Sequence, residues 1–142
     1  MAAKPRVLIA SQPAAWRILR PMLEEVFDLV TVRTTSEALK VLESGPAPSE
    51  LIISTIAFDD SRMVEFLYAA KSRQGTSAIP FICCRVLPTV LSDDAVARVA
   101  EVCMLGGAAE FIDLPALDRR SAVAALRAAA MRHIASSAAK RD

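Results

Sequence analysis

The sequence predicts an α/β fold: a doubly wound, five-stranded parallel sheet covered by helices on both faces, in a three-layer sandwich. Short apolar runs rich in β-branched residues alternate with amphipathic stretches from one end of the chain to the other. The alternation has no linker or low-complexity break, so we expect one domain over residues 1–142 with a core at about 5–136. A hydrophobic content of 54% excludes a disordered chain.

The first strand–helix unit begins with Arg6 to Ala10, a continuous apolar run suited to a strand that is buried on both faces. Ser11 to Pro13 then supplies a loop and a proline at a helix start. Pro21 lies inside this helix and is expected to kink or shorten it, because proline removes one backbone hydrogen bond. The apolar residues at helical spacing are Trp16, Leu19, Leu23 and Val26.

The second unit has a strand at Leu29 to Val32 and a helix that begins with a capping box formed by Thr34 and Glu37. We expect this helix to end at Gly45-Pro46, where glycine can adopt the left-handed conformation and proline cannot continue the helix. A third strand is predicted at Leu51 to Ile56.

A polar loop at Asp59 to Ser61 is expected to precede the third helix. The fourth strand is predicted at Ile79 to Cys84, followed by an apolar connector from Arg85 to Leu91. Ser92 begins the fourth helix, and Gly106-Gly107 ends it. The inward residues of these two helices are predicted to be Met63, Phe66, Leu67 and Ala70 in the third, and Val96, Val99, Ala100 and Cys103 in the fourth.

The fifth strand is predicted at Glu110 to Leu114, and Pro115 turns the chain. An alanine-rich final helix follows from about Asp118. Its core residues are predicted to be Val123, Leu126, Ala130 and Ile134.

Composition narrows the possible partners and the compartment. The net charge is +1, which gives no basic field for nucleic acid, and no segment has the ~20 apolar residues needed to span a membrane. The apolar run near the N-terminus is too short for a secretory signal, so we expect a cytoplasmic protein. Cys83, Cys84 and Cys103 form no CxxC pair and are expected to be buried reduced thiols, and His133 has no second ligand nearby in sequence.

In doubly wound sheets the functional groups lie at the carboxyl ends of the strands. Here the strand ends carry no carboxylate pair and no lysine. The residues at these ends are Ser11-Gln12, Thr55 to Phe58, Arg85 and Leu114-Pro115.

Over nearly the whole chain the sequence resembles the receiver domain of two-component response regulators, the CheY-like domains, and three stretches carry the resemblance. Glu50 to Ile56 is similar to the strand that delivers the family's phospho-accepting aspartate. Gly107 to Pro115 is similar to its Gly-Ala-x-x-aromatic-x-x-Lys-Pro segment, and Val7 to Gln12 to its first strand, which ends in two acidic residues. The resemblance implies a flavodoxin-like, CheY-like sandwich and a role in two-component signal transduction and phosphorelay. Only the connector from Arg85 to Leu91 is longer than in the family.

The sequence departs from the family at the positions that the resemblance marks as functional. Ser11 and Gln12 replace the acidic pair, Thr55 the aspartate, Arg85 the hydroxyl residue and Leu114 the lysine. Magnesium must lose bound water to enter a site, and a neutral Ser-Gln-Thr set binds it too weakly to offset that cost. A threonine without a nearby base also does not readily form an acyl phosphate. We therefore expect a degenerate pseudo-receiver that binds no metal and no cofactor and is not phosphorylated in the standard way.

Alternative roles remain open for several residues. Asp59 or Asp60 can serve as a displaced phosphate acceptor, or belong to a solvated loop with a helix cap. Arg85 can bind a small anion together with helix amides, or pair with Asp59, Asp60 or Asp113. Phe111 occupies the family's switch-aromatic position and is expected to be a core residue.

The sequence gives no set of catalytic residues, so we expect no enzyme. Ser11, Thr55 and the adjacent Cys83 and Cys84 are candidate nucleophiles, but the only histidine, His133, lies far along the chain in the final helix. No glycine-rich motif for nucleotide or dinucleotide phosphates is present, and the loops lack the phosphate cradle and stacking aromatics of a flavin site.

We expect instead a signalling protein partner, or self-association, through the region of the last two helices. A second apolar stripe of small residues on the final helix lets another backbone approach, although alanine also simply raises helix propensity. The surrounding arginines favour an acidic partner. The stripe is Ala124, Ala128 and Met131, and the arginines are Arg119, Arg120, Arg127 and Arg132.

Overall fold

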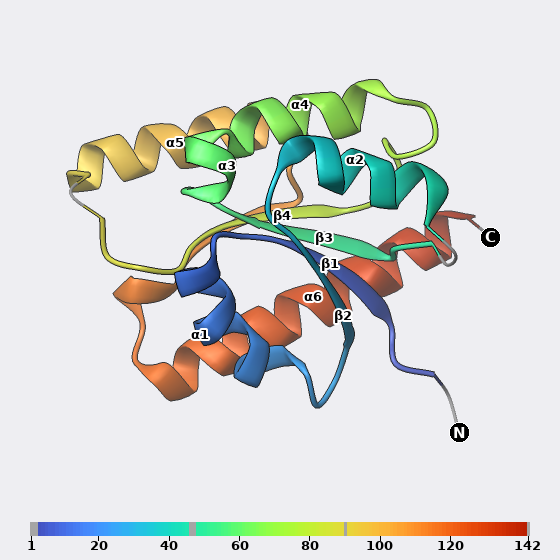
Figure 1. The fold of residues 1–142 in the computed structure, drawn as a ribbon. Helices are drawn as coiled ribbons and strands as arrows, with labels where there is room; N and C mark the ends of the chain where they lie inside the picture. The colour runs from blue at the N-terminus through green and yellow to red at the C-terminus, as the bar shows by residue number, and fades with distance from the viewer. Residues whose placement is uncertain (1–2, 46–47, 90, 142) are drawn as a thin grey trace.

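The computed structural model describes residues 3–45, 48–89 and 91–141 and shows one parallel five-stranded sheet (Figure 1). The strand order is β2-β1-β3-β4-β5, so the order reverses between β1 and β3. This doubly wound arrangement confirms the predicted fold class. The strands are β1 (Arg6–Ala10), β2 (Asp28–Val32), β3 (Leu51–Thr55), β4 (Phe81–Arg85) and β5 (Glu110–Asp113).

Helices cover both faces of the sheet, and the sheet separates two hydrophobic cores (Figure 1). On one face lie α1 (Pro13–Leu23) and α6 (Arg119–Arg141). The other face carries α2 (Thr35–Ser44), α4 (Met63–Ser72) and α5 (Asp93–Leu105). Two short segments, α3 (Phe58–Ser61) and the 3-10 turn η1 (Leu114–Ala116), follow β3 and β5 directly.

The buried side chains follow the sequence pattern closely. Every residue of β3 is buried, as is typical of a central parallel strand with helices on both faces. Met63, Phe66, Leu67 and Ala70 of α4 are all buried, as their spacing predicts. In α5, Val96 and Cys103 are buried, whereas Val99 and Ala100 are only partly covered. On α6, Leu126, Ala130 and Ile134 are buried and Val123 is partly buried.

Side-chain caps begin three of the helices. The Thr34 hydroxyl accepts a 3.1 Å hydrogen bond from the Glu37 amide, and the Glu37 carboxylate accepts one of 2.9 Å from the Arg33 amide. This is the predicted capping box with its second bond displaced by one residue. Ser92 accepts from the Ala95 amide and Asp118 from the Ser121 amide, so α5 and α6 begin where the sequence indicates.

Two expectations about helix ends were wrong. Gly45 is the C-cap of α2, as expected, but it has φ −65° and ψ 153°, an extended conformation instead of the left-handed one; Pro46 lies outside the described residues. Helix α1 ends at Leu23, two residues after Pro21, so Val26 packs on the core from the following turn instead of from the helix.

The predicted polar loop at Asp59 to Ser61 is a tight left-handed turn within α3. Asp59, Asp60 and Ser61 have φ of 50°, 55° and 65°. Aspartate tolerates this region better than most side chains, and three consecutive residues there reverse the chain direction within one turn. The Arg62 amide closes the turn with a 2.8 Å hydrogen bond to the Phe58 carbonyl.

Candidate functional site

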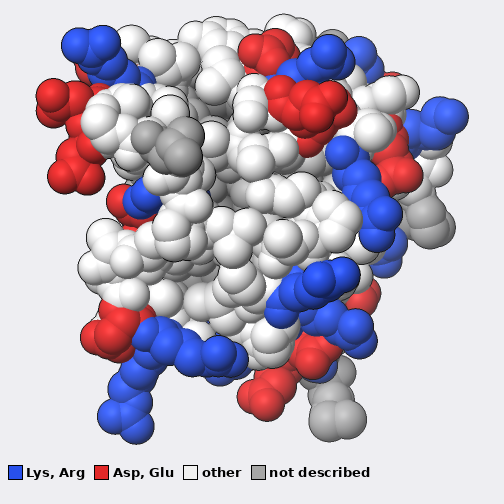
Figure 2. All heavy atoms as spheres, turned by 60° about the vertical axis from the view of Figure 1, so that its left-hand side comes forward, with Lys and Arg blue, Asp and Glu red and all other residues white. Residues whose placement is uncertain are grey.

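The carboxyl ends of β1, β3, β4 and β5 lie side by side because the strands are parallel. This end of the strands, called an edge of the sheet below, is the candidate site. Figure 2 is turned so that this side comes forward: uncharged side chains fill the middle of the view, and charged side chains lie mainly toward its rim. The structure brings together here most of the site residues singled out in the sequence. They are Ser11, Gln12, Thr55, Arg85 and Leu114.

Thr55 ends β3 and is almost completely buried. Its hydroxyl donates a 2.8 Å hydrogen bond to Oε1 of Gln12, which follows β1. Ser11, the neighbour of Gln12, is also buried, and its hydroxyl finds no partner among the described residues. The three side chains thus form a neutral, largely buried cluster with no carboxylate to attract a divalent cation.

Arg85 is the last residue of β4, one position beyond the predicted end of that strand. Its Nη1 lies 3.1 and 3.3 Å from the two carboxylate oxygens of Asp113, its register partner on β5. Its Nε donates to the Thr89 hydroxyl at 3.2 Å. Of the alternatives open in the sequence, the structure shows the pairing with Asp113, and this pairing offsets the positive charge that would attract an anion.

The cavity enclosed by these side chains is only about 20 Å³ in volume. Gln12, Thr55 and Arg85 line it, together with the first residues of the connector after β4. A space of this size holds about one water molecule.

Asp59 and Asp60 lie beyond the end of β3. The Asp59 carboxylate accepts a 2.9 Å hydrogen bond from the Thr35 amide, so it caps the first turn of α2 and not the helix that follows it in sequence. The hydrogen bond from the Thr35 amide lowers the pKa of Asp59. Asp60 is exposed. Within the described ranges, no three acidic, histidine or cysteine side chains gather as a metal site requires.

Leu114 and Phe111 occupy the remaining positions that the resemblance marks. Leu114 is buried in the core that includes α1 and α6, where its apolar side chain contributes to packing. Phe111 on β5 is partly buried and packs against the core on the opposite face of the sheet. Both side chains therefore contribute to the hydrophobic cores.

The cysteines and the histidine take no part in this edge. Cys83, Cys84 and Cys103 are free thiols and fully buried. Burial raises the pKa of Cys84 to about 12. His133 on α6 contacts the Glu110 carboxylate, with its Nε2 2.8 Å from Oε1.

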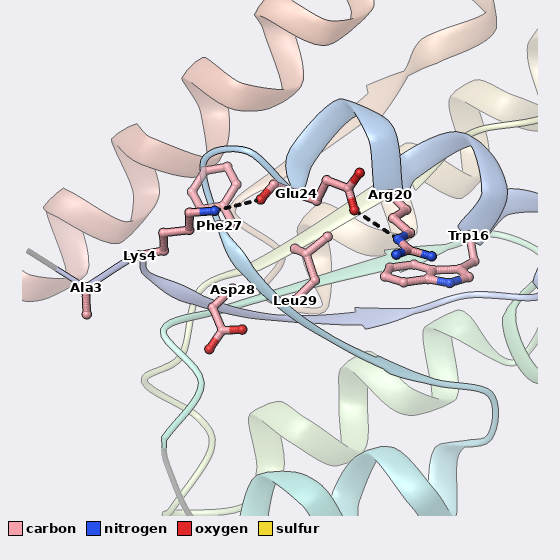
Figure 3. Close-up of a pocket in the computed structure, with 8 residues that line it drawn as sticks. All are labelled: Ala3, Lys4, Trp16, Arg20, Glu24, Phe27, Asp28 and Leu29. Carbon is pink, nitrogen blue, oxygen red and sulfur yellow. Dashed lines mark hydrogen bonds and ion pairs between the residues drawn. The ribbon is translucent and has the colours of Figure 1, made fainter.

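A cleft of about 540 Å³ lies beside the end of α1 and the start of β2 (Figure 3). Trp16, Phe27 and Leu29 form its apolar part. Its charged groups have partners in the protein: Arg20 pairs with the Glu24 carboxylate at 2.9 Å, Lys4 donates to the Glu24 carbonyl at 3.1 Å (Figure 3), and Asp28 lies 3.7 Å from Arg6. These internal bonds leave little unsatisfied charge for a ligand.

Sequence reasoning missed a second surface, between α1 and the start of α6. A groove of about 430 Å³ runs there, with an apolar lining that includes Ile18 and Leu117 and with Arg17 and Arg119 beside it. It continues onto the exposed side of α6 along Arg120 and neighbouring residues. No periodicity marks this surface, because its residues come from three separate segments.

No helix in the described part of the chain is both long and apolar enough to cross a membrane. No protein-family model matches the sequence, and no curated protein matches it.

Comparison with solved structures gives a consistent result. The chain is similar to the receiver domain of a signal transduction histidine kinase from Syntrophus aciditrophicus, with 24% identity and a TM-score of 0.72 over 93% of this chain and 91% of that one. It is also similar to the receiver domain of an HD domain-containing protein from Pseudomonas fluorescens Pf-5, with 17% identity and a TM-score of 0.71 over 99% and 94% of the two chains.

A third similar structure is the phosphorylated cyanobacterial phytochrome response regulator RcpA, with 16% identity and a TM-score of 0.69 over 89% of this chain and 91% of that one. Each similarity extends over nearly the whole of both chains. The strand order and the helices on both faces therefore make this the fold of response-regulator receiver domains, the CheY-like fold.

Proposed function

We propose that this chain is a receiver-like signalling module of the two-component type that acts by protein–protein contact, without aspartyl phosphorylation and without catalysis of its own. The observation that carries the proposal is the neutral, closed edge of the sheet. Thr55 is hydrogen-bonded to Gln12, Arg85 is paired with Asp113, and the cavity between them has a volume of about 20 Å³. Cytoplasmic localisation follows as part of the same proposal.

Loss of the acidic residues removes two requirements of phosphoryl transfer at once. Magnesium prefers charged oxygen ligands, and Ser11, Gln12 and Thr55 offer only neutral ones. The nucleophile must be a carboxylate to give an acyl phosphate, and none of these three side chains is a carboxylate. The Arg85–Asp113 pair also occupies the strand end where the family keeps a hydroxyl.

The surface best suited to a partner is the region of the last two helices. Val102, Met104 and Leu105 on α5 and Met131 on α6 are exposed, and exposed apolar groups of this kind mark contact sites when they gather on one surface. Ala124 and Ala128 on α6 are also exposed, so a second backbone can approach closely there. The nearby arginines favour an acidic partner.

A mass measurement tests the absence of phosphorylation. The protein is incubated with acetyl phosphate and magnesium and analysed by intact-mass spectrometry, with a phosphorylatable receiver as positive control. We expect no added phosphate in the unmodified chain. Addition that is lost in an Asp59→Asn/Asp60→Asn double variant would establish the displaced acceptor instead and overturn this part of the proposal.

The Thr55→Asp variant is measured in parallel. It supplies an acceptor carboxylate but leaves Gln12 and Arg85 in place, so we expect it too to remain unmodified because the magnesium ligands are still neutral. Modification of this variant alone would show that the acceptor is the only missing component.

The interaction surface is tested separately by sedimentation velocity over a hundredfold range of concentration. Self-association that is abolished by Met131→Glu, and kept in a variant such as Lys40→Glu on α2, supports a homotypic contact through α6. A monomer at all concentrations directs the search to an acidic heterologous partner, for which Arg119→Glu/Arg120→Glu is the matched loss-of-binding variant.

A further inference from the structure

A polar cleft lies at the amino ends of β4 and β5, on the side of the sheet that is opposite to the candidate site. Its volume is about 460 Å³, and it is enclosed by the segment between α4 and β4, by the start of β5 and by the C-terminal half of α6. These segments come from three distant parts of the chain. The polar side chains that line it are Lys71, Ser77, His133, Ser136, Ser137 and Lys140.

Lys71 is the central cation of this cleft. It is half-buried, and its ammonium donates to the carbonyls of Ser77 at 3.0 Å and Ile79 at 2.8 Å. An ammonium has three donors, so one donor remains beyond these two bonds. The aliphatic part of the side chain passes close to Gly107, where a Cβ atom would lie 3.3 Å from the Lys71 Cγ.

The charge of Lys71 is not neutralised by a carboxylate among the described residues: only backbone carbonyls contact it. Burial accordingly lowers the pKa of Lys71. A half-buried cation that is stabilised by carbonyl dipoles alone gains further stabilisation from an anion placed beside it.

The other residues that line the cleft also favour an anion. Lys140 supplies a second, exposed cation, and none of the described residues that line the cleft is acidic. The Glu110 carboxylate contacts His133 but also pairs with Arg132, so its charge is offset from outside the cleft. The cleft therefore presents net positive charge together with hydroxyl donors.

The hydroxyls, and the scarcity of aromatic side chains in the lining, narrow the ligand class. Ser77 and Ser136 are exposed, and the Ser137 hydroxyl contacts the Ala78 carbonyl at 3.4 Å, which ties α6 to the loop before β4. Lysines and serines together are typical donors to phosphate oxygens. Among the described residues no Phe, Tyr or Trp lines the cleft, and its one aromatic ring, the imidazole of His133, is held by the Glu110 carboxylate at 2.8 Å, so the lining offers a nucleobase little surface for stacking.

From this combination we propose that the cleft between Lys71 and Lys140 is a binding site for a small phosphorylated ligand without an aromatic ring, such as a sugar phosphate or a diphosphate. The site is independent of the degenerate edge of the sheet, about which it assumes nothing. The proposed site lies at the amino ends of β4 and β5, against α6.

Binding is measured by isothermal titration calorimetry at constant ionic strength, with inorganic phosphate, inorganic pyrophosphate and ribose 5-phosphate as probes and sulfate as the comparison anion. We expect pyrophosphate or ribose 5-phosphate to bind at least tenfold more tightly than sulfate. Tighter binding of ribose 5-phosphate than of inorganic phosphate indicates a phosphorylated metabolite, and the reverse order indicates free phosphate or diphosphate. Equal, weak heats for all four probes would overturn the proposal.

Variants assign the binding to this cleft. Lys71→Met should weaken the tightest probe at least tenfold, and Lys71→Arg should largely retain it because the charge remains. Lys71→Met also removes two hydrogen bonds to carbonyls and can disturb folding, so Lys140→Gln, at an exposed position, serves as the second test with an expected three- to tenfold loss.

Lys40→Gln, on the exposed side of α2, is the matched control and should bind like the unmodified protein. Equal affinities in the unmodified, Lys140→Gln and Lys71→Met proteins would place the binding elsewhere and refute the assignment.

Discussion

Arg85 and Asp113 are register partners on neighbouring parallel strands, and a single guanidinium nitrogen of Arg85 contacts both carboxylate oxygens of Asp113. The Arg85 side chain is only 14% exposed and that of Asp113 30% exposed. At this burial a lost partner leaves a poorly hydrated charge behind, in contrast to an ion pair on the open surface. The pair therefore contributes to holding β4 and β5 together at their carboxyl ends.

Removal of one member of this pair should destabilise the fold measurably. We expect Asp113→Asn to lower the free energy of unfolding by about 1–2 kcal/mol, because Arg85 keeps its charge and loses its counter-ion. In a double-mutant cycle with Arg85→Met, the combined loss should be smaller than the sum of the single losses by about 1 kcal/mol. Urea denaturation followed by circular dichroism gives all four values.

Arg20 and Glu24 provide the control for that cycle. They form an i,i+4 pair with side chains 61% and 50% exposed. Glu24→Gln should change stability by no more than about 0.5 kcal/mol. Equal losses for Glu24→Gln and Asp113→Asn would show that the burial of the Arg85–Asp113 pair has no energetic consequence.

Asp59 should make the free energy of unfolding depend on pH in the acid range. The hydrogen bond from the Thr35 amide lowers the pKa of Asp59 from 3.8, so the folded state holds the ionised form more strongly than the unfolded state. Its contribution is complete above the unfolded pKa and is lost as the pH falls through the lower folded pKa. Asp59→Asn should therefore flatten the decline in stability between about pH 5 and pH 2, measured by urea denaturation across this range.

Asp60→Asn is the comparison for this measurement, because its carboxylate accepts no hydrogen bond among the described residues. It should leave the acid dependence close to that of the unmodified protein. If both variants flatten the decline equally, the Thr35 hydrogen bond is not its cause.

The left-handed turn of α3 predicts an inverted preference between glycine and alanine. At Asp60, with φ 55°, Asp60→Gly should be more stable than Asp60→Ala by about 1 kcal/mol, since alanine meets the left-handed steric penalty and glycine does not. In the regular helix α5 the order is opposite, and Ala97→Gly should cost about 1 kcal/mol. Thermal and urea unfolding of the three variants decide whether the turn has this backbone conformation.

The buried thiols should be inert in the native protein. Burial raises the pKa of Cys84 to about 12, and all three cysteines are fully buried. We expect no labelling by an aromatic disulfide reagent within minutes at about pH 8, and labelling of all three thiols in denaturant. An Ala97→Cys variant, exposed on α5, should add one rapidly reacting thiol. Rapid labelling of the unmodified protein would contradict the described burial.

The sheet was predictable from the sequence because each strand is a short apolar run that must be buried. The predicted and observed bounds of the strand around Ile53 differ by one residue. The turn at Asp59 was not predictable, because a left-handed conformation in non-glycine residues depends on the tertiary contact with Thr35. The extended conformation of Gly45 was missed for a similar reason, since glycine permits both conformations.

The site was predictable in its residues but not in its pairings. Topology places Gln12, Thr55 and Arg85 at one edge, and this much follows from the order of the strands. The choice of Asp113 as the partner of Arg85 depends on the register between β4 and β5, which the sequence does not specify. The cleft at Lys71 was missed because its lining comes from segments far apart in the chain.

Helix α6 has 23 residues and is therefore about 34 Å long, enough to run from one edge of the sheet to the other (Figure 1). Its first turn carries Arg119 beside the groove along α1, and its last turns carry Lys140 beside the polar cleft at the amino ends of β4 and β5. Leu126, fully buried, lies between these ends. One continuous helix therefore connects the groove along α1 with the polar cleft on the far side of the molecule.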